Sequence, residues 1–439
     1  MKSMICKGLV ALSCIGLLAC GQVKQPSQPA TPAKTSQASE NVMNELAERY
    51  VKLTLMVGKH QDYYIDAYYG PSEWREQAAQ LPLASLLQQT EQLITEVEAI
   101  NAPSLRKDML LVQAKSVKAF IEQLNGKHFS FDEESLALYD AKSPDLTEAD
   151  FDAALAELDS LLPGEGELNQ RLASFKAEFV IPKEQLGKVF IAAIDEARQR
   201  TKQFIDLPDN EAFTIEYVTD KPWSGYNWYK GNSFSLIQIN VDFSIQIDRA
   251  IDLASHEGYP GHHVFNSLME KHLVNAKGWV EYSVYPLYSP LSLLAEGSAN
   301  YGIEVAFPEQ QRLKFEQQVL FKLAGLDASK AATYYQVQAL LGKLSYAGNV
   351  AAKRYLDGDI DKQQAVDFLM KYALSDEQKS RQRVDFIERY RAYVINYNLG
   401  QDIVKRYVEA QSHNDTNKRW QVFADLLANP RSASMMAVN

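Results

Sequence analysis

Apolar residues recur at spacings of three and four along most of the chain, and this period restricts the fold more than any other feature. It places the apolar side chains of each segment on one face of a helix. One such run consists of Leu186, Val189, Phe190, Ala193 and Ala197. Similar runs cover residues 42–60, 84–124, 146–161, 290–325, 328–356, 360–375, 377–410 and 416–428. We therefore predict a mainly α fold.

Strand patterns are confined to one short region. The runs FTIEYV (213–218) and FSLIQINVD (234–242) are rich in β-branched and aromatic residues. The Gly-, Trp- and Tyr-rich segment PWSGYNWYKGNS separates them. This arrangement predicts a small β-hairpin or sheet within the helical fold.

Composition and charge exclude several classes of protein. With 46% hydrophobic and 23% charged residues among 439, the chain is globular rather than disordered or fibrous. Its formal net charge of -11 argues against a nucleic-acid partner, because phosphate backbones are bound by an excess of basic residues. It contains no phosphate-loop glycine pattern.

The N-terminus has the pattern of a secretory signal. Lys2 and Lys7 precede the apolar run GLVALSCIGLLA, which is too short to span a bilayer. The segment LLAC, ending at Cys20, resembles a bacterial lipobox. We predict that residues 1–19 are a lipoprotein signal peptide and that Cys20 is lipidated. An ordinary signal cleaved elsewhere is the alternative.

The predicted lipid is the only membrane attachment that we expect. Gly21 after the cysteine resembles lipoproteins directed to the outer membrane of Gram-negative bacteria, facing the periplasm. Residues 20–40 are rich in Pro, Ser, Gln, Thr and Ala and predict a flexible linker. A helical domain is expected over 41–430, with an N-terminal lobe at 41–205 and a metal-site lobe at 206–430.

A histidine cluster in IDLASHEGYPGHH is the main candidate for chemistry. Of seven histidines in the chain, His256, His262 and His263 fall within eight residues, and Glu257 follows the first. Imidazoles beside a carboxylate suit a divalent transition metal. A second histidine four residues after the first is the usual peptidase spacing, but that position is Pro260. We expect the Pro-Gly pair to break the helix and bring His262 or His263 toward His256. Surface histidines in a helix-ending turn are the alternative.

Glu296 is the candidate third ligand. It lies in the apolar helical pattern of SPLSLLAEGSANYGIEVAFP. A carboxylate in such surroundings needs a partner, which is either a metal ion or a Lys or Arg elsewhere in the chain.

The segments HEGYPGHH and AEGSANYGIE resemble the motifs of the bacterial family known as domain of unknown function 885. The resemblance extends over most of residues 41–430 and includes DAYYGPSEW (66–74), PWSGYNWYKG (222–231) and YRAYVINYNLG (390–400). It implies a mostly helical fold, similar to zinc peptidases that use a glutamate as third ligand, with the metal in a central cleft. Ser298 stands where the family usually has Trp.

The resemblance also implies roles for individual residues. His256, Glu296 and one of His262 or His263 would bind one zinc ion, and Glu257 would be the general base. Tyr393 and Tyr397, one helical turn apart, are candidate donors to the oxyanion, together with the histidine that does not bind metal. Packing in the core is the alternative for the two tyrosines.

Substrate contacts are expected next to the metal helix. The strand at 234–242 could pair with an extended peptide at its edge. Tyr226, Trp228 and Tyr229 could form a wall of the cleft, or they could serve packing. A substrate carboxylate would need a basic residue, for which Arg383, Arg389 and Arg391 are candidates.

The predicted function is a membrane-anchored zinc hydrolase, a metallopeptidase acting on periplasmic or surface peptides or on a small amide. The alternative is a lipoprotein that binds peptides or other ligands on a peptidase-like scaffold without turnover. The sequence leaves open the substrate, exopeptidase or endopeptidase action, and the oligomeric state.

Overall fold

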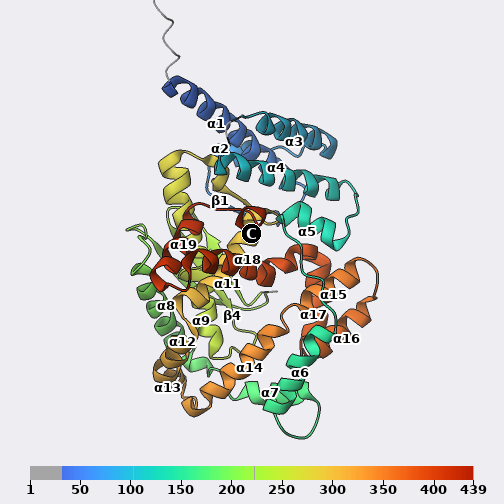
Figure 1. Cartoon of the computed structure of the whole chain (residues 1–439), viewed down its shortest axis with the longest axis vertical. Coiled ribbons are helices and arrows are strands. Elements are labelled where there is room, and N and C mark those ends of the chain that lie inside the picture. The colour runs from blue at the N-terminus through green and yellow to red at the C-terminus, as the bar shows by residue number, and fades with distance from the viewer. Residues whose placement is uncertain (1–31, 102, 222, 439) are drawn as a thin grey trace, which may run out of the picture.

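The computed structural model describes residues 32–438 apart from 102 and 222, and for residues 32–39 it describes the backbone alone. The predicted mainly α fold is confirmed, with two small sheets in the described part (Figure 1). The strands are β1 (Ile65–Tyr68), β2 (Ala212–Val218), β3 (Gly225–Tyr229), β4 (Phe234–Asn240) and β5 (Val284–Pro286).

Helices account for most of the remaining described chain. The first ten are α1 (Pro32–Val57), α2 (Ser72–Gln77), α3 (Leu83–Glu98), α4 (Leu105–Leu124), α5 (Phe131–Tyr139), α6 (Ala149–Leu161), α7 (Leu168–Ala177), α8 (Leu186–Lys202), α9 (Asp248–Leu253) and α10 (His262–Met269). The others are α11 (Pro290–Ala306), α12 (Glu309–Phe315), α13 (Phe321–Ala324), α14 (Ala331–Lys343), α15 (Ala347–Leu356), α16 (Lys362–Tyr372), α17 (Glu377–Tyr390), α18 (Ile395–Ser412) and α19 (Thr416–Ala428).

The N-terminal helix corrects the prediction of a flexible linker over residues 20–40. Helix α1 already begins at Pro32, so the last nine residues of that segment are helical. Proline is well tolerated in the first turn of a helix, and the Ala, Lys, Gln and Glu that follow are good helix formers. The signal peptide and Cys20 lie outside the described residues.

Helices α11 and α18 cross at the centre of the molecule, and glycine makes their close approach possible (Figure 1). A Cβ atom added to Gly297 would lie 2.3 Å from the carbonyl carbon of Gly400. One added to Gly400 would lie 2.8 Å from the carbonyl oxygen of Leu293. The two backbones are therefore in direct contact. This contact fixes the position of α11 relative to α18, and with it the position of Glu296, which precedes Gly297.

The three-stranded sheet has the order β2-β4-β3. Strands β2 and β4 run parallel, from Ala212 opposite Phe234 to Val218 opposite Asn240, so these two segments form the predicted small sheet and not a hairpin. The segment between them contains β3, which pairs antiparallel with β4. Aromatic residues at alternate positions let this Gly- and Trp-rich segment form a strand rather than a loop.

Three hydrophobic clusters form the core of the described chain. One joins α8 and β4 to α11 and α19, the second joins α1, α3 and α4 to β5 and α18, and the third joins α6 to α14 and α16. All three draw on residues from both predicted lobes. No helix in the described residues is long and apolar enough to cross a membrane.

A buried acid in the first cluster makes the stability depend on pH. The Glu316 side chain is fully buried, and burial outweighs the attraction of Arg312 and raises its pKa to about 7. Asp252, Asp248 and Tyr335 lie around the same Arg312. Because the folded pKa of Glu316 is raised, its contribution to stability is complete below the unfolded pKa and is lost as the pH rises toward 7.

Glu316→Gln should remove this loss. We compare the free energy of unfolding of Glu316→Gln with that of wild type at each pH. The variant's value relative to wild type should be up to about 3 kcal/mol higher at about pH 8 than at about pH 5. Urea unfolding at both pH values measures the difference, with the exposed Glu309→Gln as control. A difference between Glu316→Gln and wild type that is the same at both pH values would contradict the prediction.

Candidate metal centre

The chain turns back on itself between the first and second histidines of the cluster. Helix α9 continues into a π-helical turn (Ala254–Gly258), and α10 starts at His262. The backbone N–H of Gly261 donates to the carbonyl oxygen of Ser255 at 2.9 Å. A Cβ atom at Gly261 would lie 2.0 Å from the carbonyl oxygen of His256, so only glycine fits this turn. The predicted break at Pro-Gly is confirmed.

His256, His262 and Glu296 converge in space. The two Nε2 atoms of His256 and His262 are 3.1 Å apart. Glu296 Oε2 lies 3.3 Å from Nε2 of His256 and 3.8 Å from Nε2 of His262. The exposed fraction of each of the three side chains is between 10% and 15%, so the cluster is within reach of a small ligand.

Neighbouring groups orient the first histidine. The side-chain amide of Asn300 donates to the carbonyl oxygen of Tyr397 at 2.9 Å, which directs its Oδ1 toward Nδ1 of His256, also at 2.9 Å. Nδ1 of His256 therefore carries the proton, and the lone pair of Nε2 points at His262 and Glu296. Such a hydrogen bond on the far nitrogen is the usual support of a metal-ligating histidine.

The donor atoms fit a zinc ion. Zinc with bonds of 2.0 to 2.1 Å in tetrahedral geometry holds its ligand atoms about 3.3 Å apart, close to the three separations found here. Glu296 Oε2 is buried and has no hydrogen-bond partner among the described residues. A cation between the three atoms would satisfy this oxygen and separate two imidazoles that otherwise face each other.

The electrostatics of the cluster favour a cation. Burial raises the pKa of Glu296, but His262 and His256 lower it more, so that its pKa lies well below the usual range. Burial lowers the pKa of His262, but Glu296, Glu257 and Asp66 together raise it to about 9. The carboxylates thus create a negative potential at the point where the histidine nitrogens meet.

Glu257 is placed beside this cluster. Its side chain is buried, and one carboxylate oxygen lies within 4.8 Å of the ligand nitrogens of His256 and His262. Asn227 of β3 donates to the backbone carbonyl of Glu257 at 2.6 Å. Gly225 leaves room for the carboxylate, because a Cβ atom there would be 3.0 Å from Glu257 Oε1.

His263 lies away from the cluster, and the structure thus selects His262 from the two adjacent candidates. The His263 side chain is 1% exposed and contacts Ser235 Oγ through Nδ1 at 2.9 Å. Its Nε2 contacts Glu211 Oε2 at 3.2 Å, and Glu211 is also bound by Arg198 and Tyr259. As the next residue on α10, His263 points about 100° away from His262, and it joins the helix to the sheet.

The two candidate tyrosines lie against the middle of α11, beside Glu296 and Asn300. Tyr393 donates a hydrogen bond to Glu296 Oε1 at 2.8 Å. Tyr397 lies with its ring 5.7 Å from that of Tyr393 and is partly exposed. Ser298, where the family pattern has Trp, is buried and donates to the carbonyl of Ala295. Tyr393 therefore holds the carboxylate, and only Tyr397 is free to meet a ligand.

The aromatic candidates on β3 separate into two groups. Tyr226 donates to Asp66 of β1 and packs on Trp228, with 4.5 Å between their rings. Tyr229 is buried and donates to Glu270, which favours packing, the alternative to a place in the cleft wall. Alternation along the strand sends Tyr229 to the face opposite Tyr226 and Trp228. Sequence reasoning missed Asp66, although it opens the DAYYGPSEW segment.

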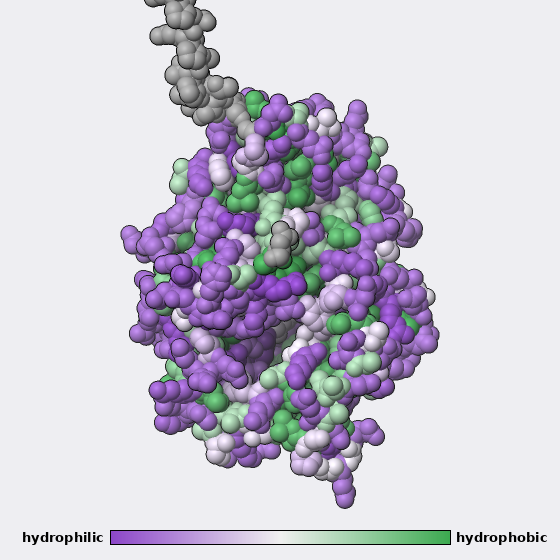
Figure 2. Space-filling view, viewed as in Figure 1, coloured by the Kyte–Doolittle hydropathy of each residue, from purple (hydrophilic) through white to green (hydrophobic). Residues whose placement is uncertain are grey.

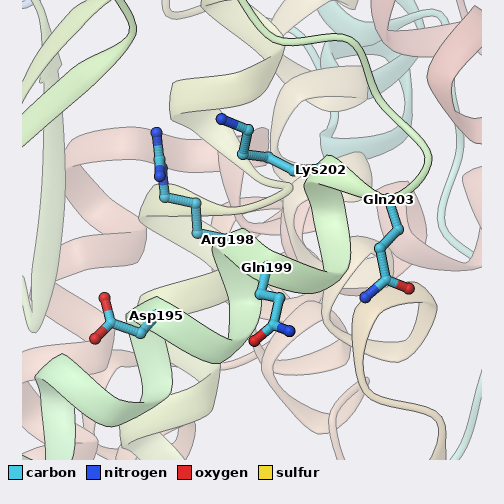
Figure 3. A pocket seen from close by; sticks show the side chains of 5 residues that line it. All are labelled: Asp195, Arg198, Gln199, Lys202 and Gln203. Carbon is cyan, nitrogen blue, oxygen red and sulfur yellow. The ribbon is translucent and has the colours of Figure 1, made fainter.

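Two hollows are visible on the surface. Figure 2 shows one with a largely hydrophilic rim, below α18 at the level of α11 and β4. The other is an open hollow of about 350 Å³ along α8. Figure 3 shows that it is lined by Asp195, Arg198, Gln199, Lys202 and Gln203. None of the converging histidines and glutamates lines it.

Comparison with known proteins finds distant structural similarity. No family model and no curated protein matches the chain. Among solved structures, the chain is similar to the crystal structure of a candidate lipoprotein from Colwellia psychrerythraea, with 16% sequence identity and a TM-score of 0.47. The match covers 81% of this chain and 68% of that one.

Proposed function

We propose that the protein is a zinc-dependent hydrolase, a metallopeptidase acting on peptides of the periplasm or cell surface. The convergence of His256 Nε2, His262 Nε2 and Glu296 Oε2 beside a buried Glu257 carries this proposal. Two imidazoles and one carboxylate are a frequent ligand set of catalytic zinc, and they leave a coordination position for water or substrate.

The bound zinc ion would polarise the scissile carbonyl and acidify the attacking water. Glu257 accepts one proton from this water and delivers it to the departing amine nitrogen. The hydroxyl group of the water ends on the carbonyl carbon as the C–N bond breaks, so one water is consumed for each bond cleaved. Tyr397 donates a hydrogen bond to the oxyanion, and Tyr393 keeps Glu296 in place.

The sheet offers one edge next to this site. Strand β4, the predicted partner of an extended peptide, is paired on both sides and has no free edge. Strand β3 lies at the edge of the described sheet and contacts the π-helical turn through Asn227. An extended substrate would therefore add to β3, with Tyr226 and Trp228 on its flank.

A diverse peptide pool tests the function. We expect the purified protein to cleave members of the pool, to lose this activity with a chelator and to regain it with added zinc, as followed by mass spectrometry. The pool with protein omitted is the control. Binding of peptides without cleavage, even after zinc addition, would instead support the non-catalytic binding lipoprotein.

We also propose that a lipid on Cys20 anchors the protein in the outer membrane, facing the periplasm, and that the chain belongs to the domain of unknown function 885 family. The LLAC segment supports the anchor, and the HEGYPGHH and AEGSANYGIE segments support the family. Cys20→Ala should release the protein from the membrane fraction. Continued membrane attachment of that variant would contradict the lipid anchor.

A further inference from the structure

Arg383 on α17 is a partly buried guanidinium that has no acidic partner within the described residues. Its carbon Cζ lies 5.0 Å from the centre of the Phe386 ring. Its Nη2 lies 3.6 Å from the place that a Cβ atom of Gly348 on α15 would take. A guanidinium withdrawn from water without a counter-ion is costly, which indicates a ligand of opposite charge.

The two neighbouring candidates of the same helix and turn are already engaged or exposed. Arg391 forms an ion pair with the buried Glu134. Arg389 is exposed and packs over the rings of Tyr63 and Tyr390. Among the three arginines that the sequence offered for a substrate carboxylate, Arg383 is therefore the one that is both partly buried and without an ion pair in the described structure.

A continuous series of contacts connects Arg383 to the metal centre. The ring of Phe386, on which the guanidinium lies, is 6.5 Å from the ring of Tyr393. Tyr393 in turn binds Glu296 and packs on Tyr397. Burial raises the pKa of Tyr397, Glu296 raises it further and Arg383 lowers it, which places the Tyr397 hydroxyl in the field of both groups.

We propose that Arg383 binds the C-terminal carboxylate of the peptide substrate, so that the protein acts as a carboxypeptidase on chains with a free C-terminus. This inference rests on the proposed peptidase function. The guanidinium fork matches a carboxylate with two parallel hydrogen bonds, a geometry that a neutral amide cannot reproduce.

Two pools of N-acetylated pentapeptides test the proposal, one with free C-terminal acids and one with the same sequences as amides. Cleavage is followed by mass spectrometry, and binding of both pools is measured by calorimetry on Glu257→Gln. We expect wild type to cleave the acids at least about 10-fold faster than the amides, and the binding to show the same preference. In Arg383→Gln both preferences should fall to about 2-fold or less, whereas Arg383→Lys keeps part of them.

The control is Arg389→Gln, an exposed arginine on the same helix, which should keep the wild-type preference. Equal cleavage or equal binding of acids and amides by the protein with Arg383 intact overturns the proposal, whether or not Arg383→Gln folds. So does an unchanged preference in a folded Arg383→Gln. If neither pool is cleaved, the peptidase proposal fails, and the calorimetric preference alone decides whether Arg383 binds a carboxylate.

Discussion

Glu257→Gln should fold, bind zinc as wild type does, and hydrolyse peptides at least about 100-fold more slowly. The glutamine has the shape of the glutamate but cannot accept a proton from water. It also keeps the packing against Gly225, and the backbone bond to Asn227 does not involve the side chain. Rates at saturating peptide, zinc content and thermal unfolding should be measured on the same preparation.

Glu304→Gln is the matched control for this experiment. Glu304 lies on α11 two turns from Glu296, but its carboxylate is paired with Lys405 and Gln401 on the exposed side of the helix. We expect its hydrolysis rate to stay near that of wild type. A Glu257→Gln protein that binds zinc and turns over peptides at the wild-type rate would rule out Glu257 as the base.

Gly297→Ala should destabilise the protein by about 3 kcal/mol or more. The added methyl would lie 2.3 Å from the backbone of Gly400, and backbone atoms cannot move aside as the end of a flexible side chain can. Separation of α11 from α18 would also move Glu296 away from Tyr393. We therefore expect weaker zinc binding together with the lower stability, measured by urea unfolding and by zinc titration.

The same substitution at the exposed Gly342 of α14 should have the opposite effect on stability. A Cβ atom there meets nothing within 4 Å, so Gly342→Ala should stabilise the protein by about 0.5 to 1 kcal/mol through its better helix propensity. If Gly297→Ala were as stable as wild type, the close contact between α11 and α18 would not hold Glu296 in place.

The helices could be predicted from the sequence because each carries its own periodic apolar face. The run from Leu186 to Ala197 predicts α8 without knowledge of its partners. The pairing of β2 and β4 could not be predicted, because a parallel register depends on the path of the chain between the strands. The strand β3 inside that path was hidden by Gly and Trp residues that are also typical of a loop.

The candidate site could be predicted in part for a similar reason. The clustering of His256, His262 and Glu257 is visible in the sequence, and so is the isolation of Glu296 among apolar residues. The choice between His262 and His263 depends on the π-helical turn and on Ser235 and Glu211, which come from distant segments. Such contacts follow from packing of the whole chain rather than from local spacing.

Zinc content tests the central claim most directly. The protein should be purified without chelator beside His256→Ala, His262→Ala, Glu296→Ala and the control Glu304→Gln, and its metals measured by elemental analysis. We predict about one zinc ion per chain in wild type and in the control, and a loss of zinc without unfolding in the three ligand variants. Wild type without zinc even after reconstitution, or His262→Ala with full zinc content, would contradict the site described here.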